Sequence, residues 1–366
     1  MDPVTGEAGG PSAESRGLFH DRAPDQVVAA LMAIVVTALA LAWAADILHL
    51  VGLTSLYTGQ MVALVLGLSC ALIFLRRPAF GDGLRHTAPW YDRLFALAAA
   101  VAGVFLSIRF PVLYEDAFYH PVEVMVVSAV LVPLVLECLR RATGWSLLLV
   151  VAVFACYALW GDVIPGKLQG RTMGIGELVS YVGLDTTAML GRPIIIAVTI
   201  VIVFIFLGRL LLESGAADFF TDVSAALLGR SRGGSAKIAV AASAMFGSVS
   251  GSAVSNVATT GILTIPMMCK GGYTARAAAA IEAVASTGGQ LAPPVMGAAA
   301  FLMAEFLQLP YRDIVVAAVI PSLLFYAAVF IQTDLEAARR GVKALDESAI
   351  PKLRAVARAG WHLIAP

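Results

Sequence analysis

The sequence predicts an all-α, polytopic integral membrane protein, and three observations support this fold class. Hydrophobic residues make up 59% of the 366 residues, and charged residues only 14%, against about 25% in an average globular chain. The apolar residues come in long uninterrupted runs, and a run of about 20 residues can cross the core of a bilayer. Basic and acidic residues are equal in number, 25 of each, so a nucleic acid is not an expected partner.

The apolar runs give the expected order of elements. Residues 1–25 are polar and lack the apolar core of a signal peptide, so they predict a disordered cytoplasmic tail. Membrane-spanning helices are then expected over 27–45, 57–75, 94–108, 121–139, 145–160, 193–212 and 314–333. Two further stretches, 238–269 and 275–303, are interrupted by small residues or proline, and the chain after 333 is polar as far as Pro366.

Lysine and arginine predict the orientation, because they favour the cytoplasmic side of a membrane protein. With a cytoplasmic N-terminus, twenty of the 25 basic residues fall inside, and the reversed topology would invert this bias. The five that fall outside are Arg109, Lys167, Arg171, Arg192 and Arg312. The count requires that the stretch between Lys237 and Lys270 begins and ends on the same side.

That stretch is expected to form a helical hairpin over about 236–268, which enters the membrane from the cytoplasm and returns. Two apolar pieces, each too short to cross a bilayer, flank the sequence Ser250-Gly251-Ser252, which is a poor helix interior. The alternative is one long helix with a small-residue packing face, in which Gly247 and Gly251 are spaced for a close helix contact.

A broken helix is expected over about 275–303. Gly288 and Gly289 loosen it, and the prolines at 293 and 294 remove backbone donors. Non-helical backbone at membrane depth is tolerated only where protein covers it or a cavity adjoins it, and transporters use the freed carbonyls to bind Na⁺. The hairpin tip adds hydroxyl groups and the amide of Asn256, which are oxygen donors suited to Na⁺. The alternative is small-residue packing with a proline kink and no ligand.

The candidate residues for binding Na⁺ or substrate are those at the tip and the break. They are Ser250, Gly251, Ser252, Ser255, Asn256, Ser286, Thr287, Gly288, Gly289 and Pro293. No cofactor or metal other than the coupling Na⁺ is expected.

Glu282 is a possible intramembrane ionisable group, and such groups are functional candidates by default. It can instead pair with a basic residue near the cytoplasmic face. No histidine falls mid-membrane in these segments, so Na⁺ coupling fits better than a proton relay. An enzyme is not expected: residues 247–251 faintly resemble a serine-nucleophile turn, but the only downstream histidine is His362, in the polar tail.

Four segments resemble the fused membrane subunit of TRAP (tripartite ATP-independent periplasmic) transporters. They read LECLRRATGW at 136–145, GRSRGGSAK at 229–237, FGSVSGSAVSN at 246–256 and STGGQLAPPVMGAAAF at 286–301. The likeness covers nearly everything after about residue 85. It implies a small four-helix membrane domain over 26–143, the first half of a large transport domain over 144–340, and a cytoplasmic polar connector over 341–366.

The resemblance also implies a mechanism and partners. The large subunit is similar to elevator-type transporters with two inverted repeats, each holding a re-entrant hairpin, a broken helix and Na⁺. The first Na⁺ site would be formed by Ser250, Gly251, Ser252 and Asn256 of the tip with Thr287, Gly288, Gly289 and Pro293 of the break. A periplasmic solute-binding protein, of the TAXI type for fused chains, would deliver an organic acid or similar small solute across the bacterial inner membrane.

One departure bears on function. Family members continue into a second repeat, whereas this sequence ends at Pro366 after the first. The missing second half of the large subunit is therefore an expected partner, and a fragment, a truncated gene and a split subunit all remain open. The alternative function is a non-transporting membrane scaffold or a degenerate truncated permease.

Overall fold

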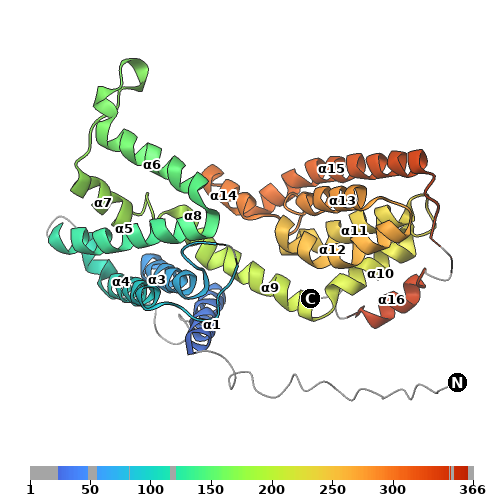
Figure 1. The fold of residues 1–366 in the computed structure, drawn as a ribbon, viewed down its shortest axis with the longest axis horizontal. Coiled ribbons are helices and arrows are strands. Elements are labelled where there is room, and N and C mark those ends of the chain that lie inside the picture. The colour runs from blue at the N-terminus through green and yellow to red at the C-terminus, as the bar shows by residue number, and fades with distance from the viewer. Residues whose placement is uncertain are drawn as a thin grey trace. The chain divides into compact units, whose positions relative to one another are not determined.

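The computed structural model describes residues 24–47, 56–81, 83–115, 121–345, 347 and 350–361. Within these ranges every regular element is a helix, and seven helices are long and apolar enough to cross a membrane. The predicted all-α polytopic class is thereby confirmed. The expected disordered tail lies almost wholly outside the described residues, and so does His362. The chain forms two compact units, Met1–Ile195 and Ile196–Pro366 (Figure 1).

The first unit contains the first five predicted spans and one shorter helix. Its helices are α1 (Pro24–Ala44), α3 (Thr58–Arg76), α4 (Trp90–Glu115), α5 (Pro121–Thr143), α6 (Trp145–Trp160) and α7 (Ile175–Leu184). Helices α3 and α4 pack closely because two glycines meet: a Cβ atom on Gly67 would lie 2.6 Å from the Cα of Gly103. Phe74, fully buried, lies in the apolar core that these helices share with Leu134 and Cys138 of α5.

A buried ion network joins the start of α4 to the end of α5. Asp92 is fully buried, and its carboxylate lies 2.7 Å from the Arg141 guanidinium and 2.6 Å from that of Arg85. Arg141 also pairs with Glu137 one turn earlier in α5. Two cations therefore surround the buried carboxylate, which is the condition under which a buried charge is tolerated.

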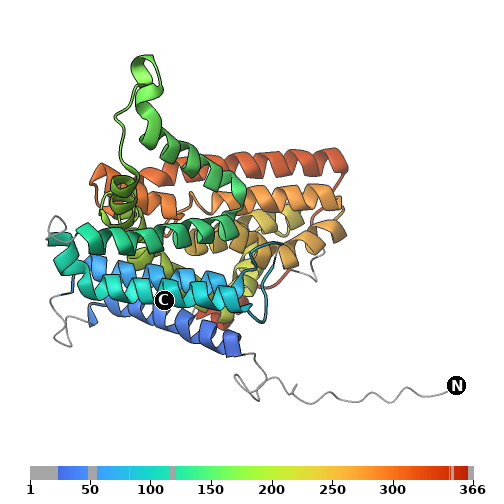
Figure 2. The same ribbon diagram turned by 60° about the vertical axis from the view of Figure 1, so that its left-hand side comes forward.

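The second unit contains the predicted hairpin and broken helix. Its helices are α9 (Ile202–Glu213), α10 (Ala216–Leu228), α11 (Gly234–Ser250), α12 (Ala253–Lys270), α13 (Ala275–Gly288), α14 (Ala298–Leu307), α15 (Tyr311–Arg340) and α16 (Leu353–Ala359). The short helix α8 (Arg192–Ile196) and a π-helical turn at Ala197–Val201 precede α9, and the three together make the sixth predicted span. Helices α11, α12, α13 and α15 lie side by side (Figures 1 and 2).

Both predicted interruptions are present. Two helices, α11 and α12, pack against each other and are separated only by Gly251 and Ser252, so the alternative of one long helix is wrong. Nine residues, 289–297, separate α13 from α14. The expected boundary near residue 143, between the small membrane domain and the large transport domain, stays a prediction. Helices α5 and α6 meet there at Gly144, whereas the compact units of the structure divide at Ile195.

Candidate cation site

The hairpin tip turns sharply at Gly251, which ends α11 in the left-handed region at φ +62°. Ser252 then caps α12 by accepting a hydrogen bond from the Ser255 backbone N–H at 3.3 Å. The Ser250 Oγ atom is buried and has no hydrogen-bond partner among the described residues. A buried hydroxyl without a partner is unfavourable, so its position needs a physical reason.

The break between α13 and α14 lies directly against this tip. A Cβ atom on Gly247 would be 2.6 Å from the Gly289 Cα, and one on Gly251 would be 2.0 Å from the Met296 carbonyl oxygen. The Val295 N–H donates to the Ser248 carbonyl at 3.0 Å. Glycine is thus required where backbone meets backbone, and the two interruptions form one irregular region.

Several backbone carbonyls in this region remain unpaired. Within 286–289, each carbonyl accepts a hydrogen bond from a later residue of the break, as does that of Gln290. The carbonyls of Leu291, Ala292, Pro293 and Met296 accept none from any described residue. The unpaired carbonyls of the break therefore begin at Leu291, two residues after Gly289, and Pro293 is the candidate residue among them.

Asn256 holds the two arms of the hairpin together. It is fully buried, and its Nδ2 donates to the Ser243 carbonyl at 2.8 Å, across from α12 to α11. Its Oδ1 lies 3.2 Å from the Thr260 hydroxyl one turn further along α12. Both polar atoms of the amide are therefore engaged within the hairpin, where the Nδ2 bond connects its two arms.

Glu282 of α13 is also fully buried, and hydroxyl groups from three helices surround its carboxyl group. Its Oε1 accepts from Ser243 of α11 at 2.7 Å and from Thr260 of α12 at 2.5 Å. Its Oε2 accepts from Thr264 at 2.6 Å, and Ser286 in its own helix lies 3.1 Å from Oε1. No Lys or Arg of the described chain forms an ion pair with it, so the expected basic partner is not found.

The remaining candidates are placed less centrally. Thr287 is exposed, and its hydroxyl bonds back to the Ala283 carbonyl at 2.7 Å. Ser286 donates to Glu282 and does not extend toward the tip. A Cβ atom on Gly288 would meet the Phe325 ring of α15 at 2.3 Å, so this glycine allows close packing of α13 on α15.

Sequence reasoning missed three hydroxyl residues of this region, Ser243, Thr260 and Thr264. A signal was available, because Asn256, Thr260 and Thr264 recur every fourth residue and therefore share one face of a helix. A polar stripe of that kind inside a membrane protein calls for a polar partner, and Glu282 is that partner.

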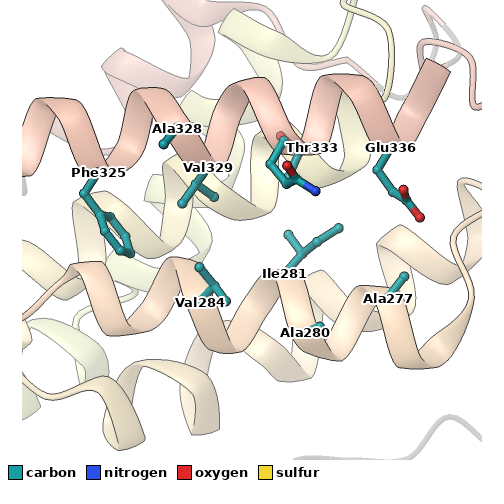
Figure 3. Close-up of a pocket in the computed structure, with 10 residues that line it drawn as sticks. Ala277, Ala280, Ile281, Val284, Phe325, Ala328, Val329, Thr333 and Glu336 are labelled. Atoms are coloured by element: carbon teal, nitrogen blue, oxygen red, sulfur yellow. The ribbon is translucent and has the colours of Figure 1, made fainter. Parts of the chain in front are cut away.

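A separate groove of about 540 Å³ runs between α13 and α15 (Figure 3). Its walls are mostly apolar, with Ile281 and Val284 facing Phe325 and Val329 and with Glu336 at one end. It contains none of the ten candidate residues. The groove lies between α13 and α15, away from the hairpin tip and the break.

Comparison with known proteins agrees with this architecture. The family model described as tripartite ATP-independent periplasmic transporter, DctM component, matches residues 130–366. The 2,3-diketo-L-gulonate TRAP transporter large permease protein YiaN of Escherichia coli (strain K12) is 28% identical over 160 residues, which are 44% of this chain and 32% of that protein. The C4-dicarboxylate TRAP transporter large permease protein DctM of Pseudomonas aeruginosa is 29% identical over 162 residues, 44% of this chain and 38% of that protein.

A third relative, the uncharacterized protein YgiK of Salmonella typhimurium, is 31% identical over 113 residues, or 31% of this chain and 24% of that protein. The matched segments thus span between 24% and 38% of the length of these three relatives. The family match covers well over half of this chain and includes the hairpin and the broken helix. The chain therefore belongs to the TRAP transporter family, as a large permease component that crosses the membrane several times.

Proposed function

We propose that the chain is the permease component of a Na⁺-driven TRAP transporter, and that its first Na⁺ site lies where the hairpin tip meets the break. The observation that carries this proposal is the unpartnered, buried Ser250 hydroxyl at the tip, in the same irregular region as the unpaired carbonyls of the break. Oxygen atoms without partners in an apolar setting are a suitable binding site for a small hard cation.

Each candidate residue has a role in this proposal. Ser250 and the open carbonyls, including that of Pro293, bind the ion. Gly251 and Gly289 let the backbone approach, and Ser252, Ser255 and Asn256 shape the tip. Ser286, Thr287 and Gly288 end α13, and Glu282 supports the packing of α11, α12 and α13 without contacting the ion.

The substrate and partners follow from the family and are part of the same proposal. Two relatives are named for transport of 2,3-diketo-L-gulonate and of C4-dicarboxylates, so we propose an organic acid or similar small solute. A periplasmic solute-binding protein, of the TAXI type, delivers it at the inner membrane. The helices over 26–143 serve as the small subunit, the N-terminus is cytoplasmic, and a second half of the large subunit completes the substrate site.

Thermal stability of the full 366-residue chain in detergent tests the Na⁺ site. An ion that binds only the folded state raises its stability, so NaCl should stabilise the protein more than KCl at equal ionic strength. Ser250→Ala should weaken Na⁺ binding roughly tenfold to a hundredfold, because a contact to a charged group contributes about 1.5–3 kcal/mol.

Ser248→Ala is the matched control, because the Ser248 hydroxyl bonds to the Met245 carbonyl at 2.9 Å within its own helix. Its response to sodium should equal that of the parent protein. Equal stability in NaCl and KCl would overturn the proposed site. Uptake by the complete transporter in proteoliposomes, with its binding protein, then tests the coupling: sodium-independent uptake driven by a proton gradient would contradict it.

A further inference from the structure

A second pocket lies at the base of the hairpin, where α11 begins and α12 ends. It has a volume of about 610 Å³ and is separate from the tip and the break. One part of its lining is polar, with Ser235, Lys270 and Lys343, and the other part is the apolar end of α12. Residues 343–345, which follow α15, line one side of the pocket, and the Leu345 N–H fixes this segment by donating to the Gly229 carbonyl at 3.0 Å. None of the proposed transport steps uses this pocket.

The first turn of α11 presents unpaired donors. Gly233 precedes the helix in the left-handed region at φ +64° and offers no side-chain cap. The N–H groups of Ala236 and Lys237 turn back to the Gly233 carbonyl, whereas those of Gly234 and Ser235 have no acceptor among the described residues. A helix N-terminus with free N–H groups carries partial positive charge and attracts anions.

An independent observation at the same place points to a ligand. Ser235 is only 2% exposed, and its hydroxyl, which lines this pocket, has no hydrogen-bond partner in the described part of the chain. It lies against Gly271, where a Cβ atom would come within 2.4 Å of the Ser235 Oγ. A buried donor left without an acceptor is unfavourable, and an oxygen of an anion would satisfy it.

The two lysines of the pocket are free of ion pairs within the described part of the chain. Neither Lys270 nor Lys343 forms an ion pair with a described acid. The nearby cations differ in this respect: Arg232 and Lys237 both bind Asp334. The pocket therefore holds two positive charges, a helix N-terminus and an orphan hydroxyl, all favouring an anion.

The apolar part of the lining indicates which kind of anion the pocket binds. Ile262, Leu263, Pro266 and Met267 of α12 line it, and Ile262 is 72% exposed. A soluble anion would leave these side chains uncovered. We propose that the pocket binds an acidic phospholipid, with its phosphate at Ser235 and the two lysines and an acyl chain along α12. Basic pockets beside membrane helices recognise acidic headgroups in this way.

Lipid titration of the purified full chain in a neutral detergent tests the site, with native mass spectrometry counting bound lipid. Phosphatidylglycerol should bind, and phosphatidylcholine should bind about tenfold more weakly or not at all. The double substitution Lys270→Gln with Lys343→Gln should weaken phosphatidylglycerol binding about tenfold or more, because each basic residue near a membrane surface contributes to attraction of acidic lipids. Arginine at both positions should preserve binding.

The matched control is Lys352→Gln with Arg354→Gln, which removes the same charge from exposed residues outside the pocket. Equal loss of lipid in both double variants would mean that net charge alone drives binding, and it would overturn the site. Inorganic phosphate is the second arm: if phosphate alone at millimolar concentration stabilised the chain as much as phosphatidylglycerol, the lipid assignment would be wrong.

Ser235→Ala distinguishes ligand binding from a structural role. Without lipid the variant should be at least as stable as the parent, because it removes a buried hydroxyl that has no partner. With phosphatidylglycerol it should bind several-fold more weakly. A variant that lost stability without lipid and bound lipid normally would show that the hydroxyl supports the fold, and the proposal would fail.

Discussion

Among the described residues, the carboxyl group of Glu282 is bound only by hydroxyl groups, and this determines how its substitution acts. Glu282→Ala would remove the four hydrogen bonds that its carboxyl group accepts, although Thr260 and Thr264 keep a backbone carbonyl of their own helix as a second acceptor. A buried hydrogen bond contributes about 0.5–1.5 kcal/mol, so the loss of these bonds should lower the free energy of unfolding by about 3 kcal/mol or more. Glu282→Gln keeps one acceptor oxygen and the shape, and it should lose about half as much. Unfolding in mixed micelles with increasing SDS measures both.

Glu213→Ala is the comparison for Glu282, because its carboxylate pairs with Arg209 while both side chains are about two-thirds exposed. An exposed pair contributes about 0–1 kcal/mol, so this variant should resemble the parent. If Glu282→Ala were equally mild, the hydroxyl cluster would not be what holds α11, α12 and α13 together.

The Gly247–Gly289 contact gives a second prediction for single residues. Gly289→Ala puts a Cβ atom 2.5 Å from the Gly247 Cα, so the break must move away from the tip. Overpacking of this kind costs about 1–3 kcal/mol, and the extra stability conferred by NaCl over KCl should shrink with it. Gly176→Ala is the control, because its nearest neighbour is the Met125 sulfur at 3.7 Å. An unchanged response to sodium in Gly289→Ala would contradict the proposed site.

At the scale of elements, the hairpin is expected to enter and leave the membrane on one side. Single cysteines at Arg230 and Arg276, placed before α11 and after α12 in a chain without its native cysteines, should both resist a membrane-impermeant thiol reagent in whole cells. A cysteine at Gly166 should react, because the charge distribution puts this loop outside. Labelling of one end of the hairpin and not the other would show that the hairpin crosses the membrane.

The sequence was sufficient for elements whose signal is local. Hydropathy located the seven spans, and Gly251 and the prolines at 293 and 294 marked the two interruptions. It was insufficient for α7, α10 and α16, because these helices are too short to give a membrane-spanning apolar run, although glycine flanks each of them. It also could not place the open carbonyls of the break, since backbone hydrogen bonding depends on how α13 unwinds and not on residue type.

At the scale of the whole molecule, the two compact units are expected to have separate roles: the second binds the ion, and the first supports the fold in the membrane. Phe74→Ala removes a fully buried ring that packs on Phe95 and lies under the Arg141 guanidinium. Such a change costs about 3–5 kcal/mol, so the yield of folded protein should fall in size-exclusion chromatography. The molecules that do fold should keep the sodium response of the parent, because the proposed ion site lies wholly in the second unit. A shifted sodium midpoint at normal yield would refute this division.

The hydroxyl cage around Glu282 has a consequence for biogenesis. A chain is synthesised from its N-terminus, so α11 and α12 are complete before α13 leaves the ribosome. An ionisable side chain entering an apolar phase alone is expensive. Ser243, Thr260 and Thr264 are already in place, however, when Glu282 arrives. We therefore expect α13 to be inserted against an assembled hairpin, so that delayed pairing of α11 with α12 would expose the nascent permease to membrane quality control.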